Sequence, residues 1–283
     1  MKAAKSAALH PAAAREHAAP IVLKLGGRAL EQHGAVREFA SALSRLGGPV
    51  VIVHGGGAEV SEWSERLGLA PSFIDGLRVT DLATLEVAVA VLAGLANKRL
   101  VAALRAEGLD AVGFAAVDGG MADVEPHPRS HALGEVGEVR TIHPHLIEVL
   151  LAEGRIPVLA SIGAHDGRLL NVNADDLACA VAAALGAPTL ALFSDVEGVN
   201  LGGRIARRLT RADLDRALAD AEVQGGMIAK LVSARRALDQ GVGTVAIARW
   251  SGPGTLEALI DHREAGTVLG DAERPSLEET RHE

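Results

Sequence analysis

Short, nearly continuous apolar runs alternate with longer amphipathic stretches between residues 20 and 270 of this 283-residue chain. Such runs are typical of strands in a parallel sheet that is covered by helices on both faces. We therefore predict an α/β fold, a three-layer α/β/α sandwich around a mainly parallel central sheet. Strands are expected at residues 21–25, 49–53, 111–116, 156–162, 189–193, 244–248 and 267–269, and helices at 29–46, 58–67, 82–107, 144–153, 174–185, 211–220, 227–240 and 255–260.

Two segments between these elements have a weaker pattern. Residues 72–79 are expected to form a short hairpin or an extended piece, and residues 118–140 are rich in Gly, Pro and charge. The second segment is predicted to form loops or short edge strands rather than core.

No linker rich in Pro, Gly or Ser divides the middle of the chain, so one continuous unit with two functional lobes is expected. The predicted division is a mobile tail (1–20), an N-terminal lobe for acceptor binding and dimerisation (21–186), a C-terminal lobe for ATP binding (187–270) and a disordered tail (271–283).

Composition excludes several classes of partner. Hydrophobic residues make up 48% of the chain, but aromatic residues only 2%, with no Tyr, so few rings are available to stack on nucleic-acid bases. The net charge of −8 has the wrong sign for a broad phosphate-backbone footprint. No uninterrupted apolar run of about 18 residues occurs, and no membrane span is expected.

The chain has a single cysteine, Cys179, in an Ala-rich helical run. It forms no internal disulfide and belongs to no zinc-binding pair. We expect a buried, small apolar residue and a reducing, cytoplasmic location.

Two glycine clusters follow predicted strands, and in parallel sheets ligands bind beyond the carboxyl ends of the strands. Lys24-Leu25-Gly26-Gly27 places a cation and exposed backbone N–H groups together. His54-Gly55-Gly56-Gly57 leads into a helix N-terminus, which favours anions. The structural alternatives are a tight turn with a surface lysine and a flexible turn with a structural histidine.

Two further clusters precede predicted helices. Asn171-Val172-Asn173-Ala174-Asp175-Asp176 supplies helix-capping side chains, but more of them than one cap needs. Gly225-Gly226-Met227-Ile228-Ala229-Lys230 places a cation in the first helical turn, where it favours a compensating anion; the alternative is an ordinary exposed lysine.

Together the four clusters indicate phosphoryl transfer, which depends on positioning and charge neutralisation. Neither a GxxxxGK[ST] loop nor a GxGxxG fingerprint occurs, and the second absence disfavours a dinucleotide-dependent oxidoreductase. No spacing of metal ligands or of a Ser-His-Asp triad is present.

With Ser194-Asp195-Val196-Glu197-Gly198-Val199, these clusters occur in the order seen in the amino acid kinase superfamily, which the chain resembles from about residue 20 to 270. Gly76-Leu77-Arg78-Val79-Thr80-Asp81 and Leu92-Ala93-Gly94-Leu95-Ala96-Asn97-Lys98 resemble acetylglutamate kinases in particular. Any one motif is weak, but seven in order are specific.

The resemblance implies a role for each matching residue. Lys24 and Lys230 would be catalytic and stabilise transition-state charge, with Asp175 holding both lysines. The phosphoryl group or the acceptor would be bound by Gly56 and Gly57, and N-acetylglutamate by Arg78 and Asn171. The implied nucleotide-binding residues are Gly26, Gly27, Ser194, Asp195, Val196, Glu197, Gly198, Val199, Glu222, Val223 and Gln224.

The implied reaction uses ATP, with Mg²⁺ carried by the nucleotide, to convert N-acetyl-L-glutamate to N-acetyl-L-glutamyl 5-phosphate in arginine biosynthesis. The carboxyl-terminal motifs Ile247-Ala248-Arg249-Trp250 and Gly266-Thr267-Val268-Leu269 resemble arginine-insensitive dimeric members, so a homodimer is expected.

Three positions have no clear role in this pattern. Ala58-Glu59 stands where a proline is common, Gln224 stands where Thr or Ser is common, and Arg28 follows the first glycine pair.

Two alternatives remain open. A sister kinase acting on N-acetyl-aminoadipate in lysine synthesis would differ by one methylene in its acceptor, which is worth about 1–3 kcal/mol of discrimination. A catalytically silent amino-acid sensor would have lost Lys24, Asp175 or Lys230, all of which are present.

Overall fold

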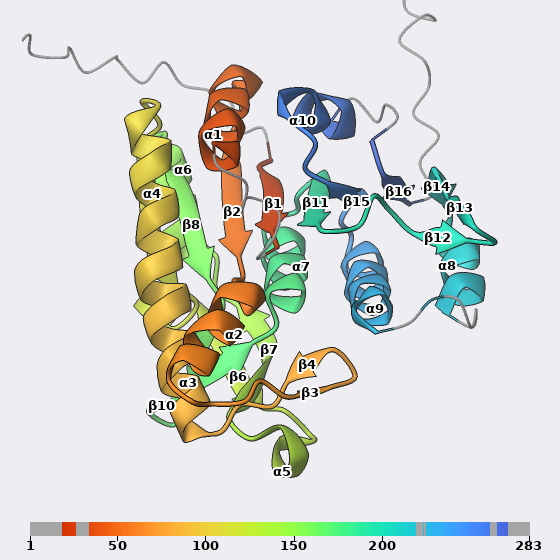
Figure 1. Ribbon diagram of the computed structural model, residues 1–283. Helices are drawn as coiled ribbons and strands as arrows, with labels where there is room; N and C mark the ends of the chain where they lie inside the picture. The colour runs from red at the N-terminus through yellow and green to blue at the C-terminus, as the bar shows by residue number, and fades with distance from the viewer. Residues whose placement is uncertain (1–18, 27–33, 219–222, 224, 261–264, 271–283) are drawn as a thin grey trace, which may run out of the picture.

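The computed structural model describes residues 19–26, 34–218, 223, 225–260 and 265–270. The centre of the molecule is an eight-stranded sheet in which only the pair formed by β15 and β16 is antiparallel (Figure 1). The fold prediction of a mainly parallel α/β sandwich is thereby confirmed. In spatial order the strands are β14 (Arg208–Leu209), β16 (Thr267–Leu269), β15 (Thr244–Arg249), β11 (Thr189–Ser194), β1 (Ile21–Leu25), β2 (Val50–His54), β8 (Ile156–Ala160) and β5 (Ala111–Ala115).

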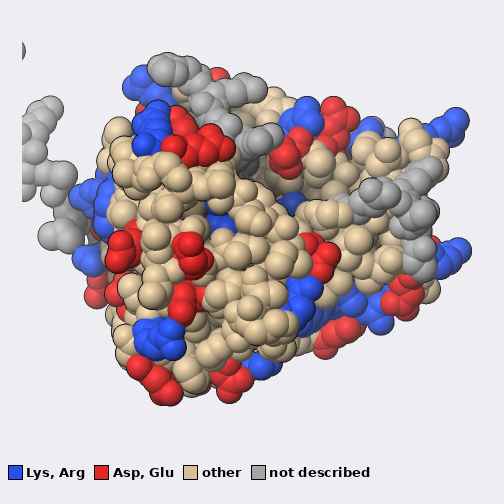
Figure 2. Space-filling view, turned by 60° about the horizontal axis from the view of Figure 1, so that its bottom comes forward, with Lys and Arg blue, Asp and Glu red and all other residues tan. Residues whose placement is uncertain are grey.

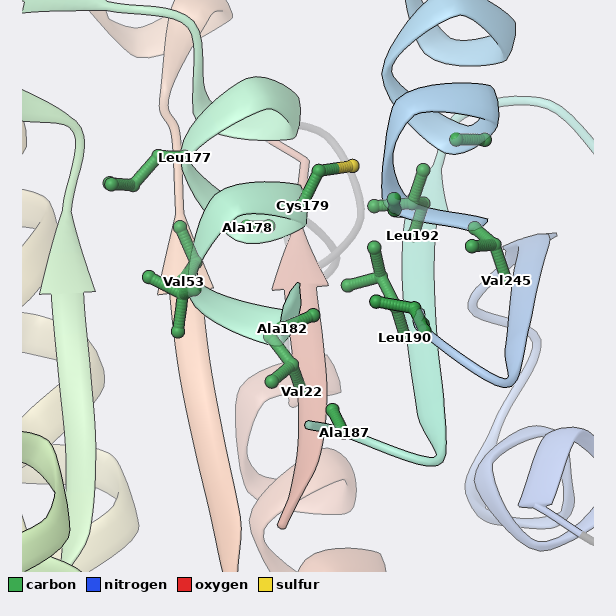
Figure 3. Close-up of a cluster of buried hydrophobic side chains, with 14 of the residues drawn as sticks. Val22, Val53, Leu177, Ala178, Cys179, Ala182, Ala187, Leu190, Leu192 and Val245 are labelled. Atoms are coloured by element: carbon green, nitrogen blue, oxygen red, sulfur yellow. The ribbon is translucent and has the colours of Figure 1, made fainter. Parts of the chain in front are cut away.

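Successive residues of each central strand face opposite helical layers, as the pleat of a strand requires. Leu23 packs under α1 (Ala35–Leu46), α4 (Asn97–Ala106) and α10 (Pro253–Ile260). The neighbouring Val22 packs into the other layer, where Cys179 is buried as expected (Figure 3). That layer is formed by α6 (His145–Ala152), α7 (Ala174–Ala184), α8 (Arg211–Leu218) and α9 (Gly226–Asp239).

A second, four-stranded sheet corrects the prediction for residues 118–140. Met121 and Val124 belong to the hydrophobic core, and β7 is seven residues long. The apolar pattern is weak there because the strands are charged and partly exposed. The strands, in spatial order, are β6 (Ala122–Pro126), β7 (Val136–Ile142), β10 (Arg168–Val172) and β9 (Ile162–His165). Sequence analysis also missed the last two.

Several small elements complete the fold. The predicted hairpin at residues 72–79 is confirmed as β3 (Phe73–Ile74) paired with β4 (Leu77–Arg78) in antiparallel register. A second small hairpin pairs β12 (Asn200–Leu201) with β13 (Arg204–Ile205), and the short helices are α5 (Ser130–Leu133) and the 3₁₀ turn η2 (Asp118–Gly120).

The helix predicted at residues 82–107 is continuous from Leu82 to Ala106 and has three parts: α3 (Leu82–Val89), the π-helical η1 (Ala90–Ala96) and α4. By length and composition it is long and apolar enough to cross a membrane, a property that sequence analysis did not identify. One side of it packs along α1, α2 (Gly57–Arg66) and β5.

The connections of the sheet define a switch point beside β1. The chain continues from β1 to β2 on one side, whereas β11 arrives on the other side. In such sheets the crevice beyond the carboxyl ends of these strands is the usual ligand site. The sheet is continuous across the predicted lobe boundary at residues 186/187, so the two lobes stay a prediction, and both predicted tails lie almost wholly outside the described residues.

Candidate active site

Two lysines converge on one carboxylate at the switch point. Lys24 lies near the end of β1, and its Nζ is 2.7 Å from Asp175 Oδ1. Lys230 lies in the first turn of α9, and its Nζ donates to Asp175 Oδ2 at 2.7 Å. Asp175 itself is in the first turn of α7. The structure therefore brings together the three residues predicted to be catalytic, although they are far apart in the sequence.

Burial makes this cluster electrostatically strong. Lys24 and Asp175 are each 6% exposed. Burial raises the pKa of Asp175, but the ion pairs with Lys24 and Lys230 outweigh that effect and hold the pKa well below its usual range. Burial lowers the pKa of Lys24, and the Asp175 carboxylate opposes that shift. With both lysines protonated, the cluster carries a net charge of +1 and is complementary to a phosphoryl group.

The N-terminus of α2 faces the same crevice. The helix begins at Gly57 after the N-cap residue Gly56, and no side chain caps it. Its first backbone N–H groups therefore have no partner within the helix. A Cβ atom on Gly56 would lie 2.7 Å from Leu92 Cδ2, so a larger residue here would displace the Leu92 side chain. The predicted anion nest at Gly56 and Gly57 is a bare helix N-terminus.

A small cavity of about 180 Å³ lies on one side of Lys24 and Asp175. Its wall includes Gly56, Gly57, Arg78 and Asn171, which are the four residues predicted to bind the acceptor. Apolar side chains form another part of the wall: Val60, Ala88, Leu92, Val136 and Val172.

Arg78 is oriented by three contacts in this cavity. Its Nη2 donates to Gly57 O at 2.6 Å and to Ser61 Oγ at 2.8 Å, and its guanidinium lies 4.7 Å from the ring centre of Phe73. Its Nη1 is buried and has no partner among the described residues. That donor is available to an acidic ligand.

The two asparagines of this cluster lie at the end of β10 and directly after it. Asn171 Nδ2 donates to Thr80 Oγ1 at 3.1 Å, which leaves its amide oxygen at the cavity wall. Asn173 Oδ1 accepts hydrogen bonds from the backbone of Asp175 and Asp176 and so caps α7. The capping alternative was therefore correct for Asn173, and the cap holds Asp175 at the start of its helix.

A larger cavity of about 550 Å³ lies on the other side of the lysine pair. Lys24, Lys230, Gly26, Ser194 and Asp195 line it, together with Ala58, Ser61, Glu62 and Glu65 of α2. A Cβ atom on Gly26 would lie 2.9 Å from Phe193 O, so the chain needs glycine between β1 and β11.

The loop that follows β11 is held by two distant residues. Arg249 donates to Asp195 O through Nε at 2.9 Å, and Thr267 Oγ1 accepts from Val199 N at 2.8 Å. A Cβ atom on Gly198 would lie 2.6 Å from that hydroxyl. Val196 and Glu197 lie between these two attachments and line neither cavity.

Of four further residues predicted to bind the nucleotide, the structure describes only one. Val223 is described and is 5% exposed, whereas Gly27, Glu222 and Gln224 lie outside the described residues, as does Arg28. Glu59 now has a partner, because Arg99 Nη1 donates to its carboxylate at 3.0 Å.

Sequence reasoning missed several cavity residues. Ser161 follows β8, is 2% exposed and lines the small cavity. The strand-end rule that found Lys24 and His54 would also have found Ser161 if applied to β8. Phe73, which lines both cavities, gave no signal because its hairpin strand is two residues long.

His54 is a neutral, structural member of the site. It is 3% exposed, and burial lowers its pKa to about 4 although its hydrogen bond with Gly55 O acts in the opposite direction. In the unfolded chain a histidine takes up its proton near pH 6.5. Between these values the unfolded state binds more protons, so stability falls as the pH falls.

We therefore expect acidification from pH 7 to pH 4 to cost about 3 kcal/mol of folding free energy through His54. Urea unfolding of the wild type and His54→Asn at both pH values measures this, because the variant lacks the titrating ring. The same pH dependence in both proteins would contradict the assignment.

Figure 2 shows Lys and Arg interspersed with Asp and Glu on the face it presents. Among the described residues, no group of three or more His, Cys, Asp and Glu side chains is arranged to hold a metal ion.

This chain belongs to the amino acid kinase family, because the family model matches residues 19–249. The acetylglutamate kinase of Koribacter versatilis is 42% identical over 255 residues, which cover 88% of this chain and 98% of that relative. The acetylglutamate kinase of Methanopyrus kandleri is 40% identical over 260 residues, which cover 88% and 99%. These relatives confirm the resemblance to acetylglutamate kinases.

Solved structures give the same fold. The structure of smu.665 from Streptococcus mutans UA159 has a TM-score of 0.76 at 31% identity and covers 89% of this chain and 98% of that chain. Carbamate kinase from Giardia lamblia bound to AMP-PNP has a TM-score of 0.65 at 16% identity, with 88% and 97% covered, and supports the fold alone.

Proposed function

We propose that this protein transfers the γ-phosphoryl group of ATP to the side-chain carboxylate of N-acetyl-L-glutamate, the second step of arginine biosynthesis. The observation that carries this proposal is the pair of ammonium groups, the buried Lys24 and the partly buried Lys230, on one carboxylate between two cavities. The relatives of about 40% identity carry the name of the same activity.

The two cavities fit two substrates of different size. The small cavity, with the free Nη1 of Arg78, suits a small dicarboxylate, because a guanidinium pairs well with a carboxylate. The larger cavity reaches the loop after β11 and suits a nucleotide. Lys24 and Gly57 line both cavities and would lie between the acceptor and the γ-phosphate.

In the proposed step a carboxylate oxygen of the acceptor attacks the γ-phosphorus of ATP. The bond from that phosphorus to the β,γ-bridging oxygen breaks, and ADP leaves with its electron pair. The products are ADP and an acyl phosphate. Lys24, Lys230 and the N–H groups of Gly56 and Gly57 would neutralise the charge that spreads over the transferred oxygens.

The choice of a carboxylate acceptor agrees with the state of Asp175. The pKa of Asp175 is held well below its usual range by the two lysines, so this group is a poor proton acceptor. A hydroxyl acceptor would need a base to remove its proton. A carboxylate is already ionised at neutral pH and needs none.

Magnesium is proposed to enter with ATP, since Mg²⁺ keeps phosphate and water ligands and uses few protein groups. It would neutralise phosphate charge. Asp195, whose Oδ1 accepts from Ser194 Oγ at 3.0 Å, lies at the wall of the larger cavity and would be the carboxylate nearest the end of β11 for such an ion, whereas Glu62 and Glu65 line the cavity from α2.

The acceptor is tested by trapping acyl phosphate as hydroxamate in the presence of ATP and Mg²⁺. N-acetylglutamate, N-acetyl-aminoadipate, glutamate and aspartate are offered in parallel. We expect N-acetylglutamate to give the highest kcat/KM. A preference for N-acetyl-aminoadipate would move the protein to lysine synthesis, and no product with any acceptor would favour a silent sensor.

We further propose that the protein is a cytoplasmic homodimer. The helix Leu82–Ala106 exposes Leu82 and Leu95, which are 65% and 38% exposed, and burial of this apolar surface would favour association. Light scattering after gel filtration should give twice the chain mass of 29.1 kDa. A monomer mass at micromolar concentration would refute the dimer.

A further inference from the structure

Asn97 is a fully buried polar residue in the otherwise apolar inner face of the helix Leu82–Ala106. It belongs to the motif from Leu92 to Lys98 that resembles acetylglutamate kinases, yet it lines neither cavity. A buried amide without hydrogen-bond partners lowers the stability of the fold, so the hydrogen bonds of Asn97 indicate its role.

The π-helical segment η1 turns Asn97 inward. Leu85 and Ala88 face the interior before this segment and Leu92 does so within it, and Leu100 and Leu104 continue the buried face after Asn97. The step from Leu92 to Asn97 is five residues, whereas an α-helix repeats its face every three or four. A π-helix supplies this longer step and is common at functional sites.

The hydrogen bonds of Asn97 determine how its amide is oriented. Its Oδ1 accepts from Lys98 Nζ at 3.0 Å, and its Nδ2 donates to Val158 O at 3.0 Å. The second proton on Nδ2 then points to His54 Nε2, also 3.0 Å away. A Cβ atom on Gly113 would lie 2.1 Å from Asn97 Oδ1, so glycine in β5 leaves the space for this amide.

This orientation assigns the tautomer of His54. Because Nε2 accepts a hydrogen bond from Asn97, the ring proton of the neutral histidine is on Nδ1. Nδ1 is 3.0 Å from Gly55 O and donates to it. The same helix also touches the next residue of the glycine loop, since Leu92 Cδ2 would lie only 2.7 Å from a Cβ atom on Gly56.

We propose that Asn97 is a positioning residue for phosphoryl transfer: through His54 it holds the Gly55 peptide, so that the N–H groups of Gly56 and Gly57 stay directed at the crevice beside Lys24. The inference rests on the proposed function, because it assigns those N–H groups to the transferred phosphoryl group. Neither Asn97 nor His54 touches a substrate.

Asn97→Leu tests this role, because leucine has a similar volume and removes both donors. We expect kcat to fall about 10- to 100-fold, as a displacement of about 1 Å does in a positioned site. KM for both substrates should change less than about threefold, because Arg78 and the larger cavity are untouched. A kcat within twofold of the wild type would overturn the proposal.

Leu104→Ala is the matched control for stability. Leu104 lies on the same buried helix face, two turns beyond Asn97, and is 0% exposed. The variant should lower Tm at least as much as Asn97→Leu while kcat stays within twofold of the wild type. An equal loss of kcat in both variants would show that Asn97 acts only through general stability.

Variants of His54 test whether Asn97 acts through the His54 side chain. His54→Asn keeps an amide donor near the place of Nδ1 and should retain more kcat than His54→Leu. Asn97→Leu should lower kcat little further in the His54→Leu background, since both changes break one chain of contacts. If the losses of kcat from the two single changes multiply in the double variant, Asn97 does not act through His54.

A measurement independent of catalysis completes the test. ¹⁵N NMR of histidine-labelled wild type, with His54→Asn to identify the signal, should show the His54 proton on Nδ1. A proton on Nε2 would contradict the proposed hydrogen bond from Asn97 to His54, even if the enzyme is active. If the wild type makes no acyl phosphate, the proposed function fails, and the NMR result still decides whether Asn97 orients His54.

Discussion

Replacement of either Lys24 or Lys230 by methionine is expected to lower kcat by about 10³-fold or more. Each ammonium group would stabilise charge that develops on the transferred phosphoryl group, and loss of a single neutral donor from such a site costs about 10²–10³-fold. Methionine keeps most of the buried stem, and Asp175 keeps one lysine partner. Both variants should therefore fold, as circular dichroism and Tm would report.

Arg235→Met is the matched control for Lys230→Met. Arg235 is on the same helix, α9, but it pairs with Asp215 and Asp239 away from the crevice. Its removal should leave kcat within about twofold, because exposed ion pairs contribute little. Wild-type turnover in Lys24→Met or Lys230→Met would contradict the catalytic assignment.

Asp175→Asn is expected to impair both stability and activity. The change leaves the buried Lys24 and the partly buried Lys230 close together without their anion, and breaking a buried ion pair such as that of Lys24 costs about 3–5 kcal/mol. Urea unfolding at pH 7 measures that loss. Because the wild-type pKa of Asp175 is lowered, its contribution is present above the unfolded value near 3.9 and is lost as the pH falls toward the folded value.

The double variant Lys24→Met/Asp175→Asn separates charge from packing. It should be more stable than Asp175→Asn alone, because one of the two unpaired charges is gone. Additive destabilisation by the two changes would show that Asp175 stabilises the fold by packing and not by its pairing with the lysines.

The central sheet could be predicted from the sequence because its strands are buried on both faces. A run such as Ile21–Leu25 is almost wholly apolar, and a glycine, Gly26, follows it directly. The second sheet could not be predicted in the same way. In β6 only Val124 is buried among polar neighbours, and the charged positions of β7 hide its alternation. The packing partners that make these strands are distant in the sequence.

The candidate site, like the fold, could be predicted only in part from the sequence. Strand ends and glycine clusters located Lys24, Gly56 and Lys230, because topology brings carboxyl ends of parallel strands to one edge. The anion required near Lys230 could not be identified from local sequence, and in the structure it is Asp175. The motif from Leu92 to Lys98 contains Asn97, but its burial could not be predicted because a π-turn changes which residue of a long helix faces inward.

The most direct test of the central claim is transfer of the γ-phosphoryl group itself. ATP labelled at the γ-phosphate is incubated with Mg²⁺ and N-acetylglutamate. The amount of label transferred to an acyl phosphate, which hydroxylamine cleaves, is then measured for the wild type and Lys24→Met. We predict one labelled acyl phosphate for each ADP formed by the wild type, and at least about 10³-fold slower formation by the variant. ADP without labelled acyl phosphate, or equal rates in both proteins, would contradict the account.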